Sequence, residues 1–194
     1  GMRQLMDMYL DAKSSTKISD FENKSLVDLI VKLGDEVNGT SDDKKKKRQE
    51  AVAETIENNV RKVIIEESQT NPKYYEKMSK LLDEIIQLRK QETCDYQDYL
   101  EKIKELASKV AEPSSGESYP NSINTRAKQA LYDNLNSDEE LANVLDHVIL
   151  DNKLDGWRDG GIKEKKLMLA VNGVISDPER TLELMKIIKA QSEY

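Results

Sequence analysis

The chain has 194 residues, of which 37% are hydrophobic and 35% are charged, with 8 glycines and 4 prolines. This composition predicts one folded domain or two small ones, and it excludes a collagen-like or disordered chain. No apolar run approaches the roughly 20 residues of a membrane span, and the net charge of −7 opposes general attraction to nucleic acid.

We expect a cytoplasmic protein with no membrane partner. The single cysteine, Cys94, cannot form a disulfide within the chain, and the first residues lack the pattern of a secretory signal. Gly1, directly before Met2, is interpreted as the remnant of a removed tag, with a native Gly-Met pair as the alternative.

Sparse glycine and proline between stretches rich in Glu, Lys, Leu, Ala and Ile favour helices over strands. Apolar residues recur at helical spacing in residues 6–10 and 25–33, with a predicted loop over residues 11–23 between them. The second of these helices is expected to end at Gly34. Its predicted face contains Leu26, Leu29, Ile30 and Leu33.

Three longer helices are predicted within residues 42–112. The first begins near Ser41, Asp42 and Asp43, and its apolar stripe is Val52, Ile56, Val60 and Val63. Asn71 and Pro72 begin the second, because Asn can cap the free amides and Pro fits the first helical position. The core face of this helix is Tyr75, Met78, Leu82 and Ile85, flanked by Tyr74, Leu81 and Leu88.

Asp95 is expected to cap the third helix. Its apolar stripe keeps the helical period: Tyr96, Tyr99, Leu100, Ile103, Leu106, Ala107 and Val110. Short turns between three such helices predict an up-and-down arrangement.

A linker over residues 113–121 is followed by shorter helices in residues 122–194. Asn124 or Thr125 begins the first, whose apolar positions are Ala127, Leu131 and Leu135. Ser137 and Glu140 match a capping box for the second, with a predicted buried face of Leu141, Val144, Leu145 and Val148. A glycine-bracketed turn around Trp157 and Arg158 leads to the last two helices, residues 162–175 and 178–191. Asp177 before Pro178 repeats the cap seen at Asn71.

The predicted fold class is therefore all-α. We expect a multi-helix bundle of antiparallel helices, with N-terminal helices over residues 1–112, a linker over residues 113–121 and a C-terminal helical subdomain over residues 122–194. The two parts pack either as one domain or as two subdomains.

No residue pattern predicts a catalytic, cofactor or metal site. The chain lacks a phosphate-binding glycine-rich loop, and the acidic run from Asp138 to Glu140 fits a helix cap better than a magnesium box. Asp159, Glu164 and Lys166 match a metal-dependent nuclease pattern only loosely, since that pattern lies on a strand. His147 is interpreted as a partly buried packing residue, and Cys94 lies in a polar turn without a neighbouring histidine.

Two groups of residues could bind a partner. The basic run Lys44, Lys45, Lys46, Lys47 and Arg48 is interpreted as a solvated helix face, with contact to DNA phosphates as the alternative. Trp157 is either an anchor between the two halves of the chain or an interface residue, because tryptophan is enriched at binding hot spots.

Several stretches resemble the C-terminal end of the R subunit of type I restriction enzymes, the motor and endonuclease subunit. They follow the same order along nearly the whole chain and end with Ser192, Glu193 and Tyr194, which resemble that subunit's natural end. The turn departs from the pattern at Gly160 and Gly161, where similar proteins tend to have a Gly-Asn pair. The resembling stretches are residues 6–12, 20–21, 26–31, 56–67, 71–82, 95–106, 119–120, 131–135, 155–158 and 162–164.

The resemblance implies a parent that translocates DNA with ATP and cleaves it, using domains whose motifs this chain does not carry. ATP and Mg²⁺ are therefore expected only in the rest of the parent subunit, and this chain is expected to be inactive alone. It is expected to dock the motor subunit to the methyltransferase and specificity subunits. DNA is expected to be met indirectly or, in the alternative hypothesis, through two basic patches, Lys44 to Arg48 and Lys163 to Lys166. The candidate interface residues are Trp157, Arg158, Lys163 and Lys166.

Overall fold

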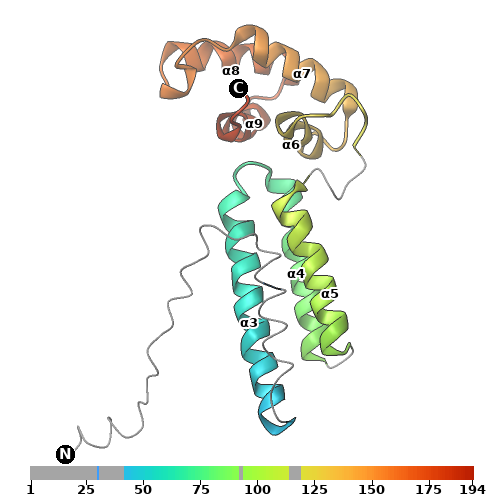
Figure 1. Ribbon diagram of the computed structural model, residues 1–194. Helices are drawn as coiled ribbons and strands as arrows, with labels where there is room; N and C mark the ends of the chain where they lie inside the picture. Colours follow the sequence, from blue (N-terminus) through green and yellow to red (C-terminus); the bar gives the residue numbers. More distant parts are fainter. Residues whose placement is uncertain (1–29, 31–41, 92–93, 114–118) are drawn as a thin grey trace, which may run out of the picture.

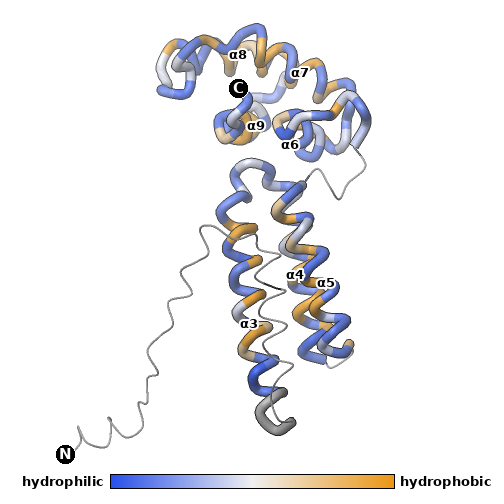
Figure 2. The backbone as a smooth tube through the Cα atoms, viewed as in Figure 1, coloured by the Kyte–Doolittle hydropathy of each residue, from blue (hydrophilic) through white to orange (hydrophobic). Residues whose placement is uncertain are grey.

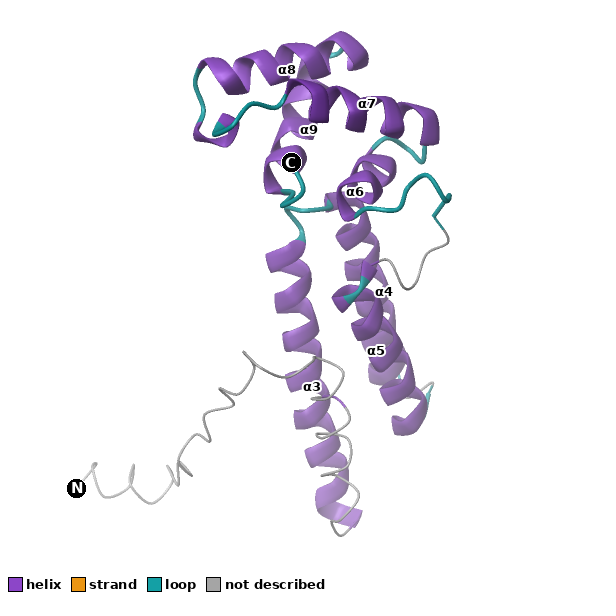
Figure 3. Ribbon diagram, turned by 45° about the horizontal axis from the view of Figure 1, so that its top comes forward, coloured by secondary structure: helices purple, strands orange, loops and turns teal. Residues whose placement is uncertain are grey.

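The computed structural model describes residue 30 and residues 42–91, 94–113 and 119–194. Over these residues the secondary structure is helical, with no strand (Figure 3), which confirms the predicted all-α fold. The helices and loop expected over residues 6–33 lie outside the described residues, except for Ile30, which is helical and 3% exposed. No helix in the described part combines the length and apolar composition needed to cross a membrane.

An N-terminal unit is formed by Ile30 and three antiparallel helices, α3 (Asp42–Glu67), α4 (Pro72–Lys90) and α5 (Tyr96–Ala111), which lie side by side (Figure 1). Apolar positions recur along all three helices, as the hydropathy colouring shows (Figure 2). The predicted caps are confirmed, because Asn71 accepts a hydrogen bond from the Tyr74 amide and Asp95 accepts one from the Asp98 amide. The buried stripe of α3 differs slightly from the prediction: Ala53, Ile56, Val60 and Ile64.

A buried polar cluster joins all three helices of the N-terminal unit. The Arg89 guanidinium on α4 binds both carboxylate oxygens of Glu57 on α3, at 2.7 and 3.1 Å. The Tyr99 hydroxyl on α5 donates to Glu57 at 3.3 Å, and its ring lies 5.7 Å from the Arg89 guanidinium. Because the Arg89 and Glu57 side chains are only 15% and 9% exposed, this pair is shielded from solvent and fixes the register of α3 against α4.

A C-terminal unit lies beyond one end of these three helices (Figure 1). It contains α6 (Arg126–Asn134), α7 (Glu139–Asn152), the short 3-10 turn η2 (Trp157–Asp159), α8 (Ile162–Ile175) and α9 (Pro178–Ala190). Its apolar cluster is separate from that of the N-terminal unit and draws on residues from Ile123 to Tyr194. Thr125, one of the two residues predicted to begin α6, caps it. Asp177 caps α9, as predicted. Of the predicted linker, residues 114–118 lie outside the described residues.

The capping box predicted at Ser137 is wrong. Asp138 caps α7 instead, and its carboxylate accepts a hydrogen bond from the Leu141 amide at 2.9 Å. Ser137 is used to close the preceding helix: its amide donates to the Tyr132 carbonyl, and its φ of 63° is left-handed. The turn between α6 and α7 is short. Ser137, which was expected to begin α7, therefore closes α6.

The predicted inner face of α7 is also partly wrong. Val144 is 43% exposed and His147 is exposed, so the histidine is not a packing residue. The buried face is instead Ala142, Leu145, Asp146 and Ile149. Asp146 faces inward because the Tyr194 hydroxyl donates to it at 2.7 Å and the Lys128 amine lies 3.6 Å away. The buried hydrogen bond between Asp146 and Tyr194 thus sets which side of α7 faces the core, and Val144 is left at the surface instead of inside.

The seam between the two units is joined by polar side chains. The Asn71 side chain donates to Asp133 at 2.6 Å and accepts from Asn134 at 2.9 Å. Elsewhere along the seam, the Gln191 side chain, which follows α9, donates to the Thr70 carbonyl in the turn between α3 and α4 at 2.7 Å. Since the two apolar clusters do not merge, these hydrogen bonds tie together two cores that are each packed internally.

Buried tyrosines should make the protein less stable in alkaline solution. Burial, reinforced by the charge of Glu67, raises the pKa of Tyr75 from 10.0 to about 12. Between these values the unfolded chain loses a proton that the folded chain keeps, so the free energy of unfolding falls as pH rises, by at most about 1.4 kcal/mol per unit. Burial also raises the pKa of Tyr99 and of Tyr194. Urea titrations from about pH 9 to about pH 12 measure this slope, and Tyr75→Phe should make it shallower. An unchanged slope in that variant would contradict the assignment.

Candidate protein-binding surface

Trp157 lies inside the C-terminal unit. Its side chain is 3% exposed and belongs to the apolar cluster of that unit. The expectations that it anchors the two halves or contacts a partner are therefore corrected. An aromatic ring of this size contributes more to stability when it is buried in an apolar cluster than when it lies at the surface.

Arg158 and Lys163 are largely engaged by the chain itself. The Arg158 guanidinium lies 5.0 Å from the Trp157 ring centre and donates to the backbone carbonyls of Lys189 and Gln191, at 3.3 and 2.5 Å. The Lys163 amine donates to the Asp155 carbonyl at 2.7 Å. These side chains hold the turn against the end of α9, so their first role is to position this part of the fold.

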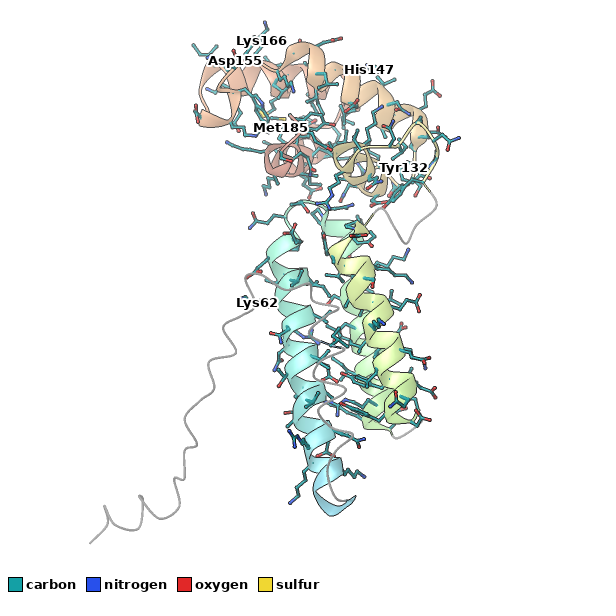
Figure 4. The ribbon with its side chains drawn as sticks, in the orientation of Figure 1. Lys62, Tyr132, His147, Asp155, Lys166 and Met185 are labelled. Carbon is teal, nitrogen blue, oxygen red and sulfur yellow. The ribbon has the colours of Figure 1, made fainter. Side chains whose placement is uncertain are left out.

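Lys166 has the surface position that the sequence suggested. It lies on the outer side of α8, away from the N-terminal unit, as does His147 on α7 (Figure 4). Residues three and four apart share a helix face, and both Lys165 and Lys166 are three or four residues from Ile162 and from Leu169. We call these four residues the outer α8 face. Ile162 is 86% exposed and Leu169 is 69% exposed.

The outer α8 face combines exposed apolar groups with positive charge. Within the described residues, no ion pair joins Lys165 or Lys166 to a carboxylate, whereas neighbouring Glu164 pairs with Lys189 at 3.1 Å. The face continues to Gly173, where a side chain would meet no atom within 4 Å. The opposite side of α8 is buried through Leu167 and Val171. The helix is thus anchored on one side and presents a basic apolar stripe on the other.

The glycine pair before α8 sets where this stripe begins. Gly160 and Gly161 have φ, ψ of 88°, −164° and 77°, −145°, a region that is essentially restricted to glycine. An Asn in this pair would require a different turn. The turn places Ile162 in the first position of α8, where its side chain projects into solvent.

The basic run lies at the far end of α3 from the C-terminal unit (Figure 1). Lys46, Lys47 and Arg48 are exposed, while the side chains of Lys44 and Lys45 lie outside the described set. Glu50 and Glu54 follow on the same helix and are also exposed. The run therefore forms a small basic patch with acidic residues close to it.

The residues considered for catalysis lie in several elements of the fold. Glu164 pairs with Lys189, Asp159 lies in the η2 turn and Lys166 is on the outer α8 face. Asp138 caps α7, and Cys94 is half-buried with a free thiol. Among the residues that the structure describes, no group of three or more His, Cys, Asp or Glu is placed to hold a metal ion.

The sequence analysis included Lys165 in a candidate basic patch but did not single out Ile162 and Leu169. A signal for them exists, because α8 has apolar residues on all sides, and only one side can face a core. Which side is buried could not be read from the period alone.

Comparison of the chain with models of protein families, with curated proteins and with solved structures finds no significant match.

Proposed function

We propose that this chain is a non-catalytic, all-helical assembly domain from the C-terminal end of a type I restriction enzyme R subunit. In this proposal it docks the motor subunit to the methyltransferase and specificity subunits in the cytoplasm. ATP and Mg²⁺ act elsewhere in the parent, which is an ATP-dependent DNA translocase and endonuclease. The ordered resemblance along the chain supports the family, and the outer α8 face supports the docking role.

The outer α8 face is the observation that carries the docking role. Full burial of an exposed aliphatic side chain contributes about 1.5 to 3 kcal/mol of favourable free energy. Burying Ile162 and Leu169 against a partner would therefore favour binding substantially. Lys165 and Lys166 stand between them and favour a partner surface with carboxylates around an apolar pocket. Exposed apolar groups that gather in one stripe, rather than being scattered singly, are a feature of protein-binding sites.

The direct test is association with the cognate methyltransferase–specificity complex, measured by sedimentation velocity. We expect a complex with a Kd tighter than about 10 μM, which corresponds to about −7 kcal/mol. Raising the salt concentration should weaken it moderately, because exposed lysines contribute. Absence of a complex at tens of micromolar would reject docking by this domain alone.

A second candidate function is a module that positions DNA through local basic patches. The exposure of Lys46, Lys47 and Arg48 at the start of α3 favours it. Replacing Lys44, Lys45, Lys46, Lys47 and Arg48 with Gln should then weaken duplex binding and reduce its salt dependence. Lys102→Gln with Lys104→Gln, on the exposed side of α5, is the control, which removes two positive charges instead of five. Equal duplex affinity in the two variants would dismiss this function.

A further inference from the structure

A groove of about 1000 Å³ opens at the seam, between the two units. One wall is formed by the end of α3 and the start of α4, and the other by α9 with the last residue of α6. We call it the waist groove. It is larger than the cavity of about 530 Å³ between α3 and α4, and it lies where two separately packed cores meet, a common location for binding sites.

The floor of the waist groove is apolar. Ile64, Tyr75 and Ile187 line it and are 4%, 4% and 6% exposed. Ile65 stands at the groove with 64% of its surface exposed. The groove therefore offers an apolar concave surface together with a large apolar side chain that the chain itself leaves in water.

Lysines from both walls give the groove a positive character. Lys73 on α4 and Lys186 on α9 line it together with Glu76 and Glu183. Glu76 is bound to Lys80 at 2.7 Å, and this bond together with the charges of Lys80 and Lys73 lowers the pKa of Glu76. Within the described residues no ion pair closer than 4 Å holds Lys73 or Lys186. When Lys80, the partner of Glu76, is counted, three lysines stand against two carboxylates at the groove. This excess of one positive charge favours a ligand that carries negative charge beside an apolar surface.

We propose that the waist groove is a docking site for an acidic amphipathic helix of a partner protein. A helix places apolar side chains at i, i+3, i+4 and i+7 on one face, which suits a groove that can take several side chains. Its flanking carboxylates would meet Lys73 and Lys186 on the two walls. The described residues contain no strand to which an extended segment could add, so a helix is the favoured form. This site is distinct from the outer α8 face and does not rest on the proposed function.

The test uses the full chain and two labelled synthetic peptides. Both are amphipathic helices with leucines at i, i+3, i+4 and i+7, and they differ only in having Glu or Lys at the flanking positions. Fluorescence anisotropy should show that the Glu peptide binds at least about tenfold more tightly than the Lys peptide. Lys73→Glu with Lys186→Glu should reverse this preference, because the charges of both walls are inverted.

Matched apolar variants locate the binding. Ile65→Asp should weaken binding of the Glu peptide by about tenfold or more. Leu150→Asp, at a 43% exposed position on α7 that belongs neither to the groove nor to the outer α8 face, should leave it unchanged. Equal binding of the two peptides, or equal losses in the two variants, would overturn the proposal. So would concentration-dependent self-association that Ile65→Asp abolishes, since a second copy of the chain would then be the occupant.

Discussion

Replacing Arg89 with alanine is expected to lower the free energy of unfolding of the N-terminal unit by about 3 to 5 kcal/mol. The change leaves the Glu57 carboxylate, whose side chain is 9% exposed, without its bidentate partner. A buried charge that loses its counter-ion costs far more than a surface charge does. Urea unfolding followed by circular dichroism measures the loss.

Arg61→Ala is the matched control for this prediction. Arg61 also joins α3 to α4, through Asp83 at 2.7 Å, but the two side chains are 40% and 54% exposed. Its loss should therefore cost less than about 1 kcal/mol. Replacing Glu57 and Arg89 together with methionine should recover most of the stability lost in Arg89→Ala, because no buried charge remains. Equal losses for Arg89→Ala and Arg61→Ala would contradict the assignment.

Trp157→Ala is expected to destabilise the C-terminal unit by about 3 to 5 kcal/mol, the usual loss for a large aromatic removed from a core. The indole is 3% exposed within the apolar cluster, and Arg158 stacks over it. Trp157→Phe should cost less, since the indole N–H has no hydrogen-bond partner within the described residues. Thermal and urea unfolding followed by circular dichroism measure the losses. Ile162→Ala, at an 86% exposed position, is the control, with an expected change within about 0.5 kcal/mol.

Trp157 also provides a probe for one unit, because it is the single tryptophan of the chain. Its fluorescence should report the unfolding of the C-terminal unit, while circular dichroism reports both units. In the Arg89→Ala variant, the circular dichroism transition should therefore move to lower urea than the fluorescence transition. Coincident transitions in that variant would instead mean that the polar seam couples the two cores into one cooperative unit.

The helices could be predicted because their boundaries are set locally. Three helices are capped by hydrogen bonds to amides only two or three residues away, from Asn71, Asp95 and Asp177. Such contacts can be predicted from a few neighbouring residues. The stripe of α5 is equally local, since its period is regular from Tyr99 to Val110. These features depend little on the rest of the fold.

The predictions were wrong where contacts between residues far apart in the sequence determine which side chains are buried. The orientation of α7 depends on Asp146 and Tyr194, which are 48 residues apart and joined by a buried hydrogen bond. Trp157 lies between charged residues and glycines in the sequence, and only the packing of α8 and α9 around it makes it a core residue. A helical period shows which residues share a face, but it does not show which face meets a core.

The candidate site was only partly predictable for the same reason. Lys166 could be proposed from the sequence, whereas Ile162 and Leu169 look like core residues until Leu167 and Val171 are seen to face inward. The waist groove could not be predicted at all, because its walls come from α3, α4, α6 and α9. Such a groove exists only once the two units are placed against each other.

The central claim is that the outer α8 face docks this chain to the methyltransferase–specificity complex. The most direct measurement compares the Kd of the unmodified chain with that of the Ile162→Asp, Leu169→Asp variant, using Leu182→Asp on α9, which is 54% exposed, as the control. The account predicts a loss of about tenfold or more for the double variant, unchanged circular dichroism and little effect of the control. Equal affinity for all three chains would contradict it.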